Sequence, residues 1–314
     1  MRVGTKVIVA TNSRSNTVKW CDAFEGSLPE TQFIPWDEAG EPVGADYAVV
    51  WQPAPALFLR ETRLRAVFNL GAGIDSVLRL AELPRDLPIV RLEDAGMAEQ
   101  MVEYVVYGLL RATRQFAVYE TQQRAGEWVG LPAVDRTRWS VGVMGLGVIG
   151  ERVARAVAQL GYPVAGWARH AKEIPGVEVY GGADQLPAFL ARTRVLVNLL
   201  PLTPETENIL NRKNLEQLLP HAYLINVARG RHLVEQDLLD LLASGQIAGA
   251  MLDVFSSEPL PKSHPFWSHA AITVTPHVAA ITLREDTVDQ IVNKIVNLKQ
   301  GLPISGLVSR DHGY

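Results

Sequence analysis

Three charged side chains have the types that reduction of a keto group requires, and each follows a predicted strand. They are Arg229 within residues 226–230, Glu258 within residues 253–259 and His277 within residues 275–280. A hydride can be delivered to a 2-keto acid if a fixed cation holds the carboxylate and an acid protonates the keto oxygen. The guanidinium of Arg229 suits the first role, and the imidazole of His277, with an ordinary pKa of about 6.5, suits the second. Glu258 can favour the protonated imidazole by accepting its hydrogen bond.

Each of these residues also has an ordinary structural explanation. Arg229 can be a surface ion-pair partner, Glu258 can be a solvated loop residue, and His277 can cap the end of a strand. Their grouping favours chemistry, because parallel strands bring the loops that follow them to one edge of a sheet. We therefore predict that the three side chains form a catalytic site.

Other reactive residues are predicted to lie outside that site. Four histidines occur in polar loops and are predicted to face solvent: His221, His232, His264 and His269. Cys21 has no histidine nearby in the sequence and is predicted to pack in a core. Asp253 ends a predicted strand and can be a structural residue.

A glycine-rich stretch can hold the hydride donor. Gly145, Gly147 and Gly150 have the spacing G-x-G-x-x-G, after a short apolar strand at residues 140–144 and before a helix at residues 151–160. In dinucleotide sites the first glycine allows a tight turn, the second admits the diphosphate, and the third lets helix and strand pack closely. The amino end of the helix offers free N–H groups to the phosphates. The alternative is an ordinary glycine-rich turn, but the strand-turn-helix context favours dinucleotide binding.

The end of the next strand indicates which dinucleotide binds. An NAD-binding unit usually has a carboxylate there, about 20 residues after the glycines, which binds the ribose 2′-hydroxyl. Residues 166–170 contain Arg169 and no carboxylate. A guanidinium can donate paired, charge-assisted hydrogen bonds to a 2′-phosphate. We therefore predict NADP rather than NAD, the alternative being that Arg169 is a solvated surface residue.

Alternating strands and helices predict the scaffold that positions these groups. After the glycine motif, strands are expected at residues 162–168, 177–180, 194–200, 222–227, 248–254 and 272–275. Helices are expected at residues 183–191, 233–244 and 282–300, and another is expected to begin at Thr203 as N-cap with Pro204 in its first turn. This alternation predicts an α/β fold with a parallel, doubly wound sheet whose ligands bind at the carboxyl ends of the strands.

The first hundred residues predict a second, smaller α/β unit. Its strands are expected at residues 6–10, 47–51, 66–70 and 89–92. The turn Gly71-Ala72-Gly73 precedes a helix at residues 74–83, and it can bind an anion on backbone N–H groups or be a plain connection. A long helix at residues 98–124 is predicted to lead from one domain to the next, with an irregular stretch at residues 128–139 beyond it.

Composition restricts the classes of function. A chain of 314 residues, 47% hydrophobic and 20% charged, is typical of a globular protein of about two domains. The formal net charge of −4 gives no reason to expect nucleic acid or an anionic membrane as a partner. A single cysteine excludes an intrachain disulfide, and neither a signal peptide nor a membrane span is recognisable, so the expected location is the cytoplasm.

Several further motifs extend along nearly the whole chain. They are FNLGAGIDS at residues 68–76, RLEDAGMAEQM at 91–101, LLPLTPET at 199–206, AMLDVF at 250–255 and PHVAAIT at 276–282. With these motifs the chain resembles the D-isomer-specific 2-hydroxyacid dehydrogenases, and among them most closely the bacterial glyoxylate and hydroxypyruvate reductases. The missing carboxylate near Arg169 departs from the broad family, but these reductases share it and use NADPH.

The resemblance implies roles for particular residues. It implies that Arg229, Glu258 and His277 are catalytic, with Arg229 and His277 also contacting the substrate. It implies that backbone N–H groups at Ala72 and Gly73 bind the substrate carboxylate, and that Trp51 lines the pocket, although Trp51 can instead be a core residue. The cofactor-binding set is then Gly145, Leu146, Gly147, Val148, Ile149, Gly150, Arg169, Leu200, Pro201, Val227, Ala228, Arg229 and Asp253. No metal is expected.

The resemblance also implies an overall organisation and an activity. Residues 1–100 and 283–314 are expected to form a flavodoxin-like substrate domain, interrupted by a Rossmann dinucleotide-binding domain at residues 101–282. A homodimer is expected. The expected reactions are NADPH-dependent reduction of glyoxylate to glycolate and of hydroxypyruvate to D-glycerate. The alternatives are reduction of another 2-keto acid such as phenylpyruvate or pyruvate, or a dinucleotide-sensing, co-repressor-like protein without turnover.

Overall fold

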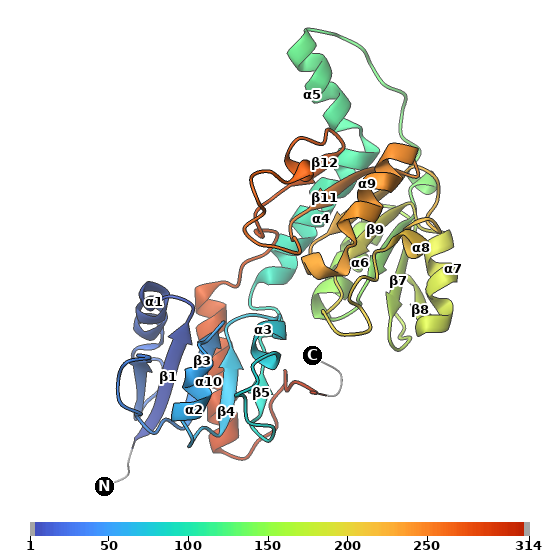
Figure 1. The fold of residues 1–314 in the computed structure, drawn as a ribbon. Coiled ribbons are helices and arrows are strands. Elements are labelled where there is room, and N and C mark those ends of the chain that lie inside the picture. The colour runs from blue at the N-terminus through green and yellow to red at the C-terminus, as the bar shows by residue number, and fades with distance from the viewer. Residues whose placement is uncertain (1–3, 311–314) are drawn as a thin grey trace. The chain divides into compact units, whose positions relative to one another are not determined.

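The computed structural model describes residues 4–310, which fold into two compact α/β units (Figure 1). Unit 1 comprises the chain up to Gly96 and the chain from Thr282 onward, and unit 2 comprises Met97–Ile281. Unit 2 is therefore inserted within the sequence of unit 1. The boundaries expected from the sequence are 100/101 and 282/283, whereas the units divide after Gly96 and after Ile281.

Unit 1 contains a five-stranded parallel sheet in the order β2-β1-β3-β4-β5. Its strands are β1 (Thr5–Thr11), β2 (Thr31–Pro35), β3 (Tyr47–Trp51), β4 (Ala66–Asn69) and β5 (Ile89–Val90). This order is that of the flavodoxin-like fold. Strand β2 is not among the predicted strands; it is an edge strand that pairs with β1 alone and ends in a proline.

Helices cover both faces of this sheet. They are α1 (Arg14–Phe24), α2 (Ala56–Arg60), α3 (Asp75–Leu78) and α10 (Arg284–Lys299). Val7 and Val9 of β1 point to the face covered by α1 and α10, whereas Ile8 points to the face covered by α2 and α3. This alternation follows from the two-residue period of a strand. Ile291 and Ile295 fix α10 in the core of unit 1, at the other end of the chain from β1.

Unit 2 contains a seven-stranded parallel sheet in the order β12-β11-β10-β9-β6-β7-β8. Its strands are β6 (Val141–Met144), β7 (Val164–Ala168), β8 (Glu178–Gly181), β9 (Val195–Asn198), β10 (Ala222–Asn226), β11 (Ile247–Leu252) and β12 (Ile272–Val274). Counted from β6, six of the strands have the Rossmann order 3-2-1-4-5-6, and β12 extends the sheet by one strand. The strand order reverses between β6 and β9, where open α/β sheets bind their ligands.

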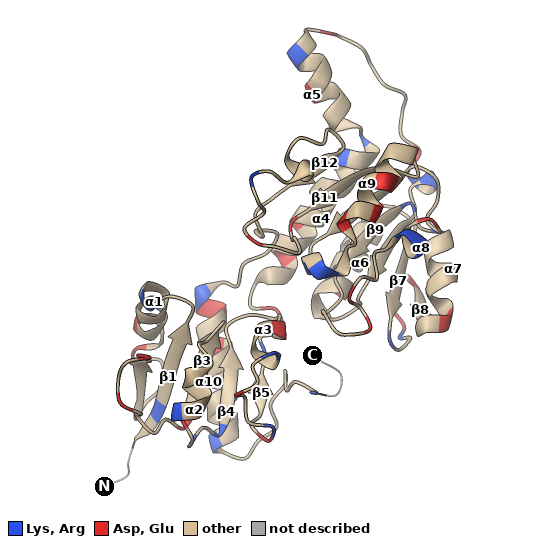
Figure 2. Cartoon of the chain, in the orientation of Figure 1, with Lys and Arg blue, Asp and Glu red and all other residues tan. Residues whose placement is uncertain are grey.

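The helices of unit 2 complete the doubly wound arrangement. They are α4 (Met97–Thr113), α5 (Phe116–Ala125), α6 (Val148–Gln159), α7 (Leu186–Ala191), α8 (Arg212–Leu215) and α9 (Glu235–Ser244). One face of the sheet packs on α4 and α6, and the other face packs on α7, α8 and α9. The charged residues within the described strands of both sheets are Lys6 and Glu178, so charge gathers on helices and loops (Figure 2). Among residues 4–310, no helix is both long and apolar enough to cross a membrane.

Three helix predictions differ from the structure. The helix expected at residues 74–83 is confined to α3, Asp75–Leu78. The helix expected at residues 98–124 is broken at Gln115, where φ is +54°, into α4 and α5. The helix expected to begin at Thr203 does not form, because the Thr206 hydroxyl bonds the Thr203 N–H and the Pro201 carbonyl and closes a turn instead. The next helix, α8, begins only after Asn211, whose side chain accepts the N–H of Asn214.

Candidate active site

The glycine motif joins β6 to α6, as expected, but the helix begins at Val148 rather than at residue 151, so Gly145 and Gly147 precede it and Gly150 lies in its first turn. Gly145 has φ of +94°, and a Cβ there would lie 2.7 Å from the Leu199 carbonyl oxygen. A Cβ on Gly150 would collide with the Gly145 carbonyl oxygen, so helix and turn can approach only without side chains. Gly147 instead faces open space, and α6 begins at Val148 with backbone N–H groups that lack partners within the helix. Open space beside these N–H groups suits the diphosphate of a dinucleotide.

The side chains around this turn differ in what they can offer a ligand. Leu146 is buried in the core, so its backbone is the part that can contact a cofactor, whereas Val148 is exposed. Arg169 is exposed just beyond the end of β7, and no carboxylate occurs at residues 166–170. Glu151 of α6 is already ion-paired with Arg155 and Lys172. The strand end therefore presents positive charge where an NAD site would present a carboxylate.

A buried amide network holds the loop that carries Arg229. Asn226, the last residue of β10, donates from Nδ2 to the Arg229 carbonyl oxygen at 3.2 Å and accepts the Ala228 N–H at its Oδ1. Asn198, the last residue of β9, donates to that same Oδ1 at 3.0 Å and accepts the N–H of Leu200. Both asparagines are fully buried. The two amides thus fix residues 200 and 228–229, which lie in segments expected to contact the cofactor.

His232 completes this network and corrects a prediction. It is predicted to face solvent, but its ring is fully buried. Its Nδ1 lies 2.9 Å from Asn198 Nδ2, which is a donor, so Nδ1 accepts and Nε2 carries the proton. Nε2 then donates to the Pro201 carbonyl oxygen at 3.2 Å. His232 is therefore a neutral structural histidine of this site.

His277 and Glu258 form a direct pair. Nδ1 of His277 lies 2.7 Å from Oε2 of Glu258, and the other carboxylate oxygen of Glu258 accepts the Phe255 N–H at 2.9 Å. The hydrogen bond to Glu258 raises the pKa of the imidazole, against opposition from burial and from the positive charge of Arg229. Burial raises the pKa of Glu258, but the hydrogen bonds from His277 and Phe255 outweigh it, and the pKa falls. The structure therefore brings Arg229, Glu258 and His277 into one electrostatic cluster.

Asp253 supports the backbone around His277. It is 1% exposed, and its carboxylate accepts the N–H groups of Val278 and Ala279, each at 2.9 Å. The Thr275 hydroxyl donates to the same carboxylate at 2.6 Å, and the His277 N–H bonds the backbone oxygen of Asp253. Asp253 is predicted to contact the cofactor, and in the structure its carboxylate lies against the loop of His277.

The residues expected to bind substrate in unit 1 also cluster. Trp51 ends β3, and a Cβ on Gly71 would collide with its indole ring. Asn69 donates from Nδ2 to the carbonyl oxygens of Gly71 and Gly73 at 2.9 and 3.0 Å. Because a trans peptide points its N–H away from its carbonyl, the N–H of Ala72 is directed away from Asn69. The turn at residues 71–73 is thus preorganised, with Ala72 and Gly73 partly exposed.

Comparison with known proteins identifies the family. The family model described as "D-isomer specific 2-hydroxyacid dehydrogenase, NAD binding domain" matches residues 106–279, which is more than half of the chain. The chain belongs to the D-isomer specific 2-hydroxyacid dehydrogenases. Within that family, glyoxylate/hydroxypyruvate reductase A of Salmonella enteritidis is 45% identical over 304 residues, covering 95% of this chain and 97% of the relative. The Yersinia enterocolitica protein of the same name is 44% identical over 301 residues, covering 94% and 96%.

Two solved structures of similar proteins share the whole architecture. A D-isomer specific 2-hydroxyacid dehydrogenase from Xanthobacter autotrophicus, in complex with NADPH and MES, has a TM-score of 0.93 and 36% identity over 99% of this chain and all of that one. An NADPH-dependent glyoxylate/hydroxypyruvate reductase from Sinorhizobium meliloti, in complex with NADP and sulfate, has a TM-score of 0.92 and 38% identity over 99% and 100%. The predicted α/β fold, with a Rossmann unit and a smaller flavodoxin-like unit, is confirmed.

Other predictions for this dehydrogenase can be compared with the structure. Cys21 is buried, as expected, and burial raises the pKa of its thiol to about 12. His221 is exposed, whereas His264 is half-buried with its Nε2 3.2 Å from Oε2 of Glu235. The residues that the sequence analysis misses are Asn198 and Asn226. Their signal is a polar residue at the end of an otherwise apolar strand, repeated in neighbouring strands.

Proposed function

We propose that the protein is an NADPH-dependent reductase that converts glyoxylate to glycolate and hydroxypyruvate to D-glycerate. The observation that carries this proposal is the 2.7 Å contact between His277 and Glu258 within the field of Arg229. An acid after β12 and a fixed cation after β10, at one edge of the same sheet, match what a 2-keto acid needs for reduction. The reductases named above, similar over nearly their whole length, support the choice of substrates.

The dinucleotide fits the residues present. The open space at Gly147 and the N–H groups at the start of α6 would hold its diphosphate, and Arg169 would bind a 2′-phosphate. When bound, the reduced nicotinamide supplies a hydride for the keto carbon. The complex of the Xanthobacter structure with NADPH supports the choice of coenzyme. Further proposed contacts are Leu146, Val148, Ile149, Leu200, Pro201, Val227, Ala228, Arg229 and Asp253.

His277 is proposed as the general acid. Its Nδ1 proton is directed to Glu258, so Nε2 is the nitrogen from which a proton can pass to the keto oxygen. The carboxylate of Glu258 keeps the imidazolium populated to higher pH than an isolated histidine would be. The guanidinium of Arg229 is proposed to hold the substrate carboxylate and polarise the ketone. Backbone N–H groups at Ala72 and Gly73, beside Trp51, are proposed to bind a substrate carboxylate.

A substrate panel tests the proposed function. NADPH oxidation is measured with glyoxylate, hydroxypyruvate, pyruvate and phenylpyruvate, and the series is repeated with NADH. We expect the highest kcat/KM for glyoxylate and hydroxypyruvate with NADPH. A higher value for pyruvate or phenylpyruvate would establish the alternative substrate class. Binding of NADPH without turnover of any keto acid would favour a dinucleotide-sensing, co-repressor-like protein.

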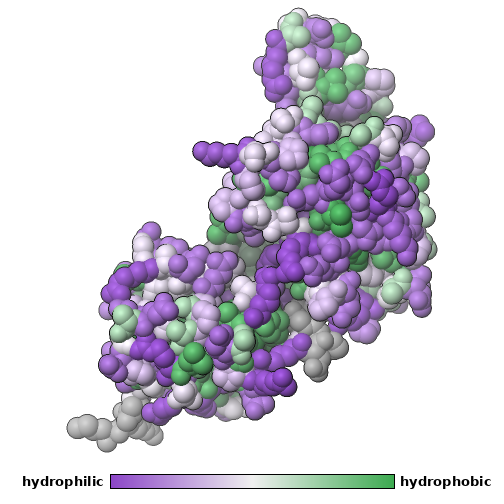
Figure 3. All heavy atoms as spheres, in the orientation of Figure 1, coloured by the Kyte–Doolittle hydropathy of each residue, from purple (hydrophilic) through white to green (hydrophobic). Residues whose placement is uncertain are grey.

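A homodimer is proposed from an exposed arm of unit 2, which consists of helix α5 and the chain after it as far as Trp128. Helix α5 has no buried residue, and Figure 1 shows that it extends away from the rest of unit 2. Phe116, Val118 and Tyr119 are each 36–43% exposed on it, and Trp128 beyond it is fully exposed; hydrophobic side chains of this arm are visible in Figure 3. A ten-residue helix without tertiary packing is marginal in water. A second copy of the chain would cover these side chains, and two-fold dimers are the commonest assemblies.

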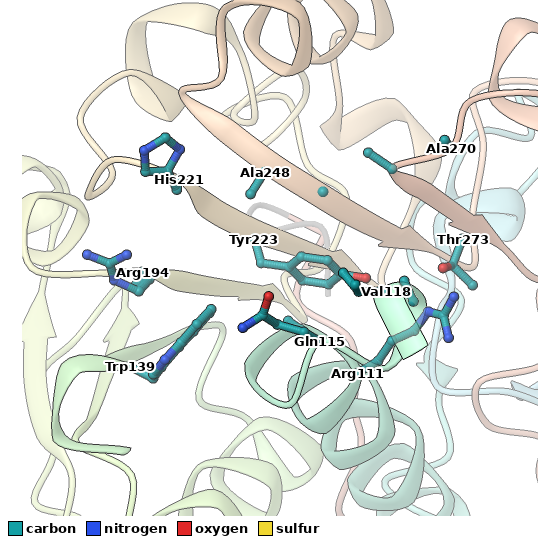
Figure 4. A pocket seen from close by; sticks show the side chains of 14 residues that line it. Arg111, Gln115, Val118, Trp139, Arg194, His221, Tyr223, Ala248, Ala270 and Thr273 are labelled. Atoms are coloured by element: carbon teal, nitrogen blue, oxygen red, sulfur yellow. The ribbon is translucent and has the colours of Figure 1, made fainter. Parts of the chain in front are cut away.

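A cavity at the base of the arm supports this proposal. It has a volume of about 360 Å³ and is lined by Arg111, Val118, Trp139, Arg194 and Tyr223, among others (Figure 4). Arg194 and His221 directly precede β9 and β10, so the cavity lies at the amino ends of the strands, opposite to the catalytic loops. It is therefore separate from the proposed active site and available to the arm of another copy.

Light scattering after size exclusion tests the dimer. Trp128→Asp is expected to lower the measured mass towards that of one chain, and Leu59→Asp is the control, because Leu59 is also a large hydrophobic residue and is 66% exposed in unit 1. A wild-type mass of one chain at micromolar concentration would refute the homodimer. A cytoplasmic location stays a prediction from the sequence.

A further inference from the structure

A chain of hydrogen bonds leads from helix α4 to the loop of His277. Tyr104 Oη lies 2.5 Å from Thr275 Oγ1, and Thr275 Oγ1 donates to Asp253 Oδ1 at 2.6 Å. A threonine hydroxyl has one proton, and the carboxylate takes it. Tyr104 is therefore the donor to Thr275. Because each hydroxyl in such a chain polarises the next, the Tyr104 bond strengthens the hold of Thr275 on Asp253.

The carboxylate of Asp253 in turn fixes the backbone of the loop that carries His277. Its carboxylate is buried and needs its donors, since an unsatisfied buried carboxylate is costly. Two of these donors are the backbone N–H groups of Val278 and Ala279, directly after His277. The direction in which the carboxylate faces thus determines where the backbone after His277 can lie.

His277 needs such support because its backbone is strained. Its φ is +57°, a region that residues other than glycine rarely adopt. The loop is held from the Asp253 side through the backbone, and the imidazole is held from the Glu258 side. Relaxation of the backbone would turn the ring away from Glu258 and change the direction of Nε2.

Helix α4, where this series of hydrogen bonds begins, is packed firmly in the core of unit 2. Met101, Val105 and Leu109 on the same helix are buried in the core of unit 2. Tyr104 is partly buried beside them, and burial raises the pKa of its phenol far above the ordinary value. The phenol therefore stays protonated, and remains a donor, throughout the neutral pH range.

We propose that Tyr104 is a positioning residue for the reduction: through Thr275 and Asp253 it fixes the backbone that aims the imidazole of His277. This inference rests on the proposed function for its kinetic consequence. The hydroxyl of Tyr104 bonds Thr275 and not the imidazole or Glu258. Its effect should therefore appear in the rate of the chemical step rather than in binding.

Tyr104→Phe removes the phenol oxygen alone and tests the proposal. With the keto acid that the wild type reduces fastest, we expect kcat to fall roughly tenfold and KM for substrate and coenzyme to stay within about twofold. Tyr107→Phe is the matched control, since Tyr107 is an exposed tyrosine of the same helix. Unchanged kcat in Tyr104→Phe, or an equal loss in the control, would overturn the proposal.

A double-mutant cycle asks whether the effect passes through Thr275. Thr275→Val removes the hydroxyl. Thr275→Ser keeps it, and this variant should have the wild-type kcat. In the Thr275→Val background, Tyr104→Phe should cause no further loss of kcat, because the chain is already broken. Additive losses in the double variant would show that Tyr104 acts by another route and would refute the proposed relay.

A spectroscopic measurement keeps the test independent of turnover. NMR titration of the imidazole, assigned by its loss in His277→Gln, reports the pKa that Glu258 raises and that Arg229 and Asp253 also influence. Tyr104→Phe is expected to lower that pKa, because the contact with Glu258 loosens, while Tyr107→Phe leaves it unchanged. If the wild type reduces no keto acid, the proposed function fails, and this titration still decides the role of Tyr104: an unchanged pKa refutes it.

Discussion

Two loops at the same edge of the unit 2 sheet are held in opposite electrostatic ways. The Arg229 loop is fixed by Asn198, Asn226 and His232, which are all buried and uncharged. The His277 loop is fixed by the buried carboxylate of Asp253. In the proposed function Arg229 binds an anionic substrate, and neutral amides suit that role because a carboxylate would compete for the guanidinium. An imidazole that must hold a proton gains from negative charge nearby.

The difference predicts which kinetic constant should change when each loop is altered. A neutral hydrogen bond contributes about 1 kcal/mol, and one to a charged group contributes about 1.5–3 kcal/mol. Changes around His277 should therefore lower kcat steeply. Changes around Arg229 should mainly weaken substrate binding.

The largest effect is expected at the imidazole itself. His277→Ala should lower kcat by roughly 10²–10⁴ with little change in coenzyme affinity, because the proton donor is lost. Steady-state NADPH oxidation measures it. His264→Ala is the control, since His264 forms a similar pair with Glu235 elsewhere in unit 2. A full-rate His277→Ala enzyme would remove the general acid from the proposed mechanism.

A reciprocal exchange of amide and carboxylate addresses the comparison directly. Asp253→Asn would turn an amide N–H towards backbone N–H groups, and kcat should fall roughly 100-fold. Asn226→Asp would place a carboxylate beside Arg229, and KM for the keto acid should rise roughly tenfold. Asp135→Asn, an exposed carboxylate that caps a short turn, should change neither value. If both exchanges altered the same kinetic constant, the two loops would not have separate roles.

A smaller effect, confined to high pH, is expected at Glu258. The pKa of His277 is raised first by its hydrogen bond to Glu258, so the imidazole stays protonated to higher pH than an unpaired one. Glu258→Gln lowers that pKa, and the alkaline limb of the kcat/KM profile for reduction should move to lower pH. Glu235→Gln, which alters the other histidine pair, should leave the limb in place. A limb at the wild-type pH in Glu258→Gln would contradict the assignment.

The smallest effect is expected outside both loops. Arg169→Ala should lower kcat/KM for NADPH by roughly fivefold and leave the value for NADH nearly unchanged, since an exposed charge contributes modestly. Parallel kinetics with the two coenzymes measure the ratio. Arg212→Ala, which removes an exposed arginine on α8, is the control. An equal loss with NADH would assign Arg169 a structural role.

The positions of Arg229, Glu258 and His277 can be predicted from the sequence, because apolar runs show where strands end and parallel strands end at one edge of a sheet. The role of Asn198 and Asn226 is missed, because the bonds of Asn198 to Asn226 and to His232 join residues 28 and 34 positions apart and depend on strand pairing. His232 follows two arginines in a polar stretch, so nothing local shows that its ring is buried.

The helix break has a comparable cause. Helical periodicity continues across Gln115, and only its positive φ separates α4 from α5. The turn after Thr203 shows the reverse, because a good capping pattern is overridden by the hydroxyl of Thr206. Local patterns thus predict the elements better than the side-chain contacts that end them.

The insertion of unit 2 has a consequence for the growing polypeptide. The sheet of unit 1 is encoded before residue 91, but α10, which covers one of its faces, begins only at Arg284. At roughly 5–20 residues per second, a ribosome needs roughly 10–40 s to synthesise the intervening unit 2. During that interval the apolar face around Val7 and Val9 has no α10 to cover it, whereas unit 2 is continuous and can fold as it emerges. The core of unit 1 can therefore be completed only after the whole of unit 2 has been synthesised.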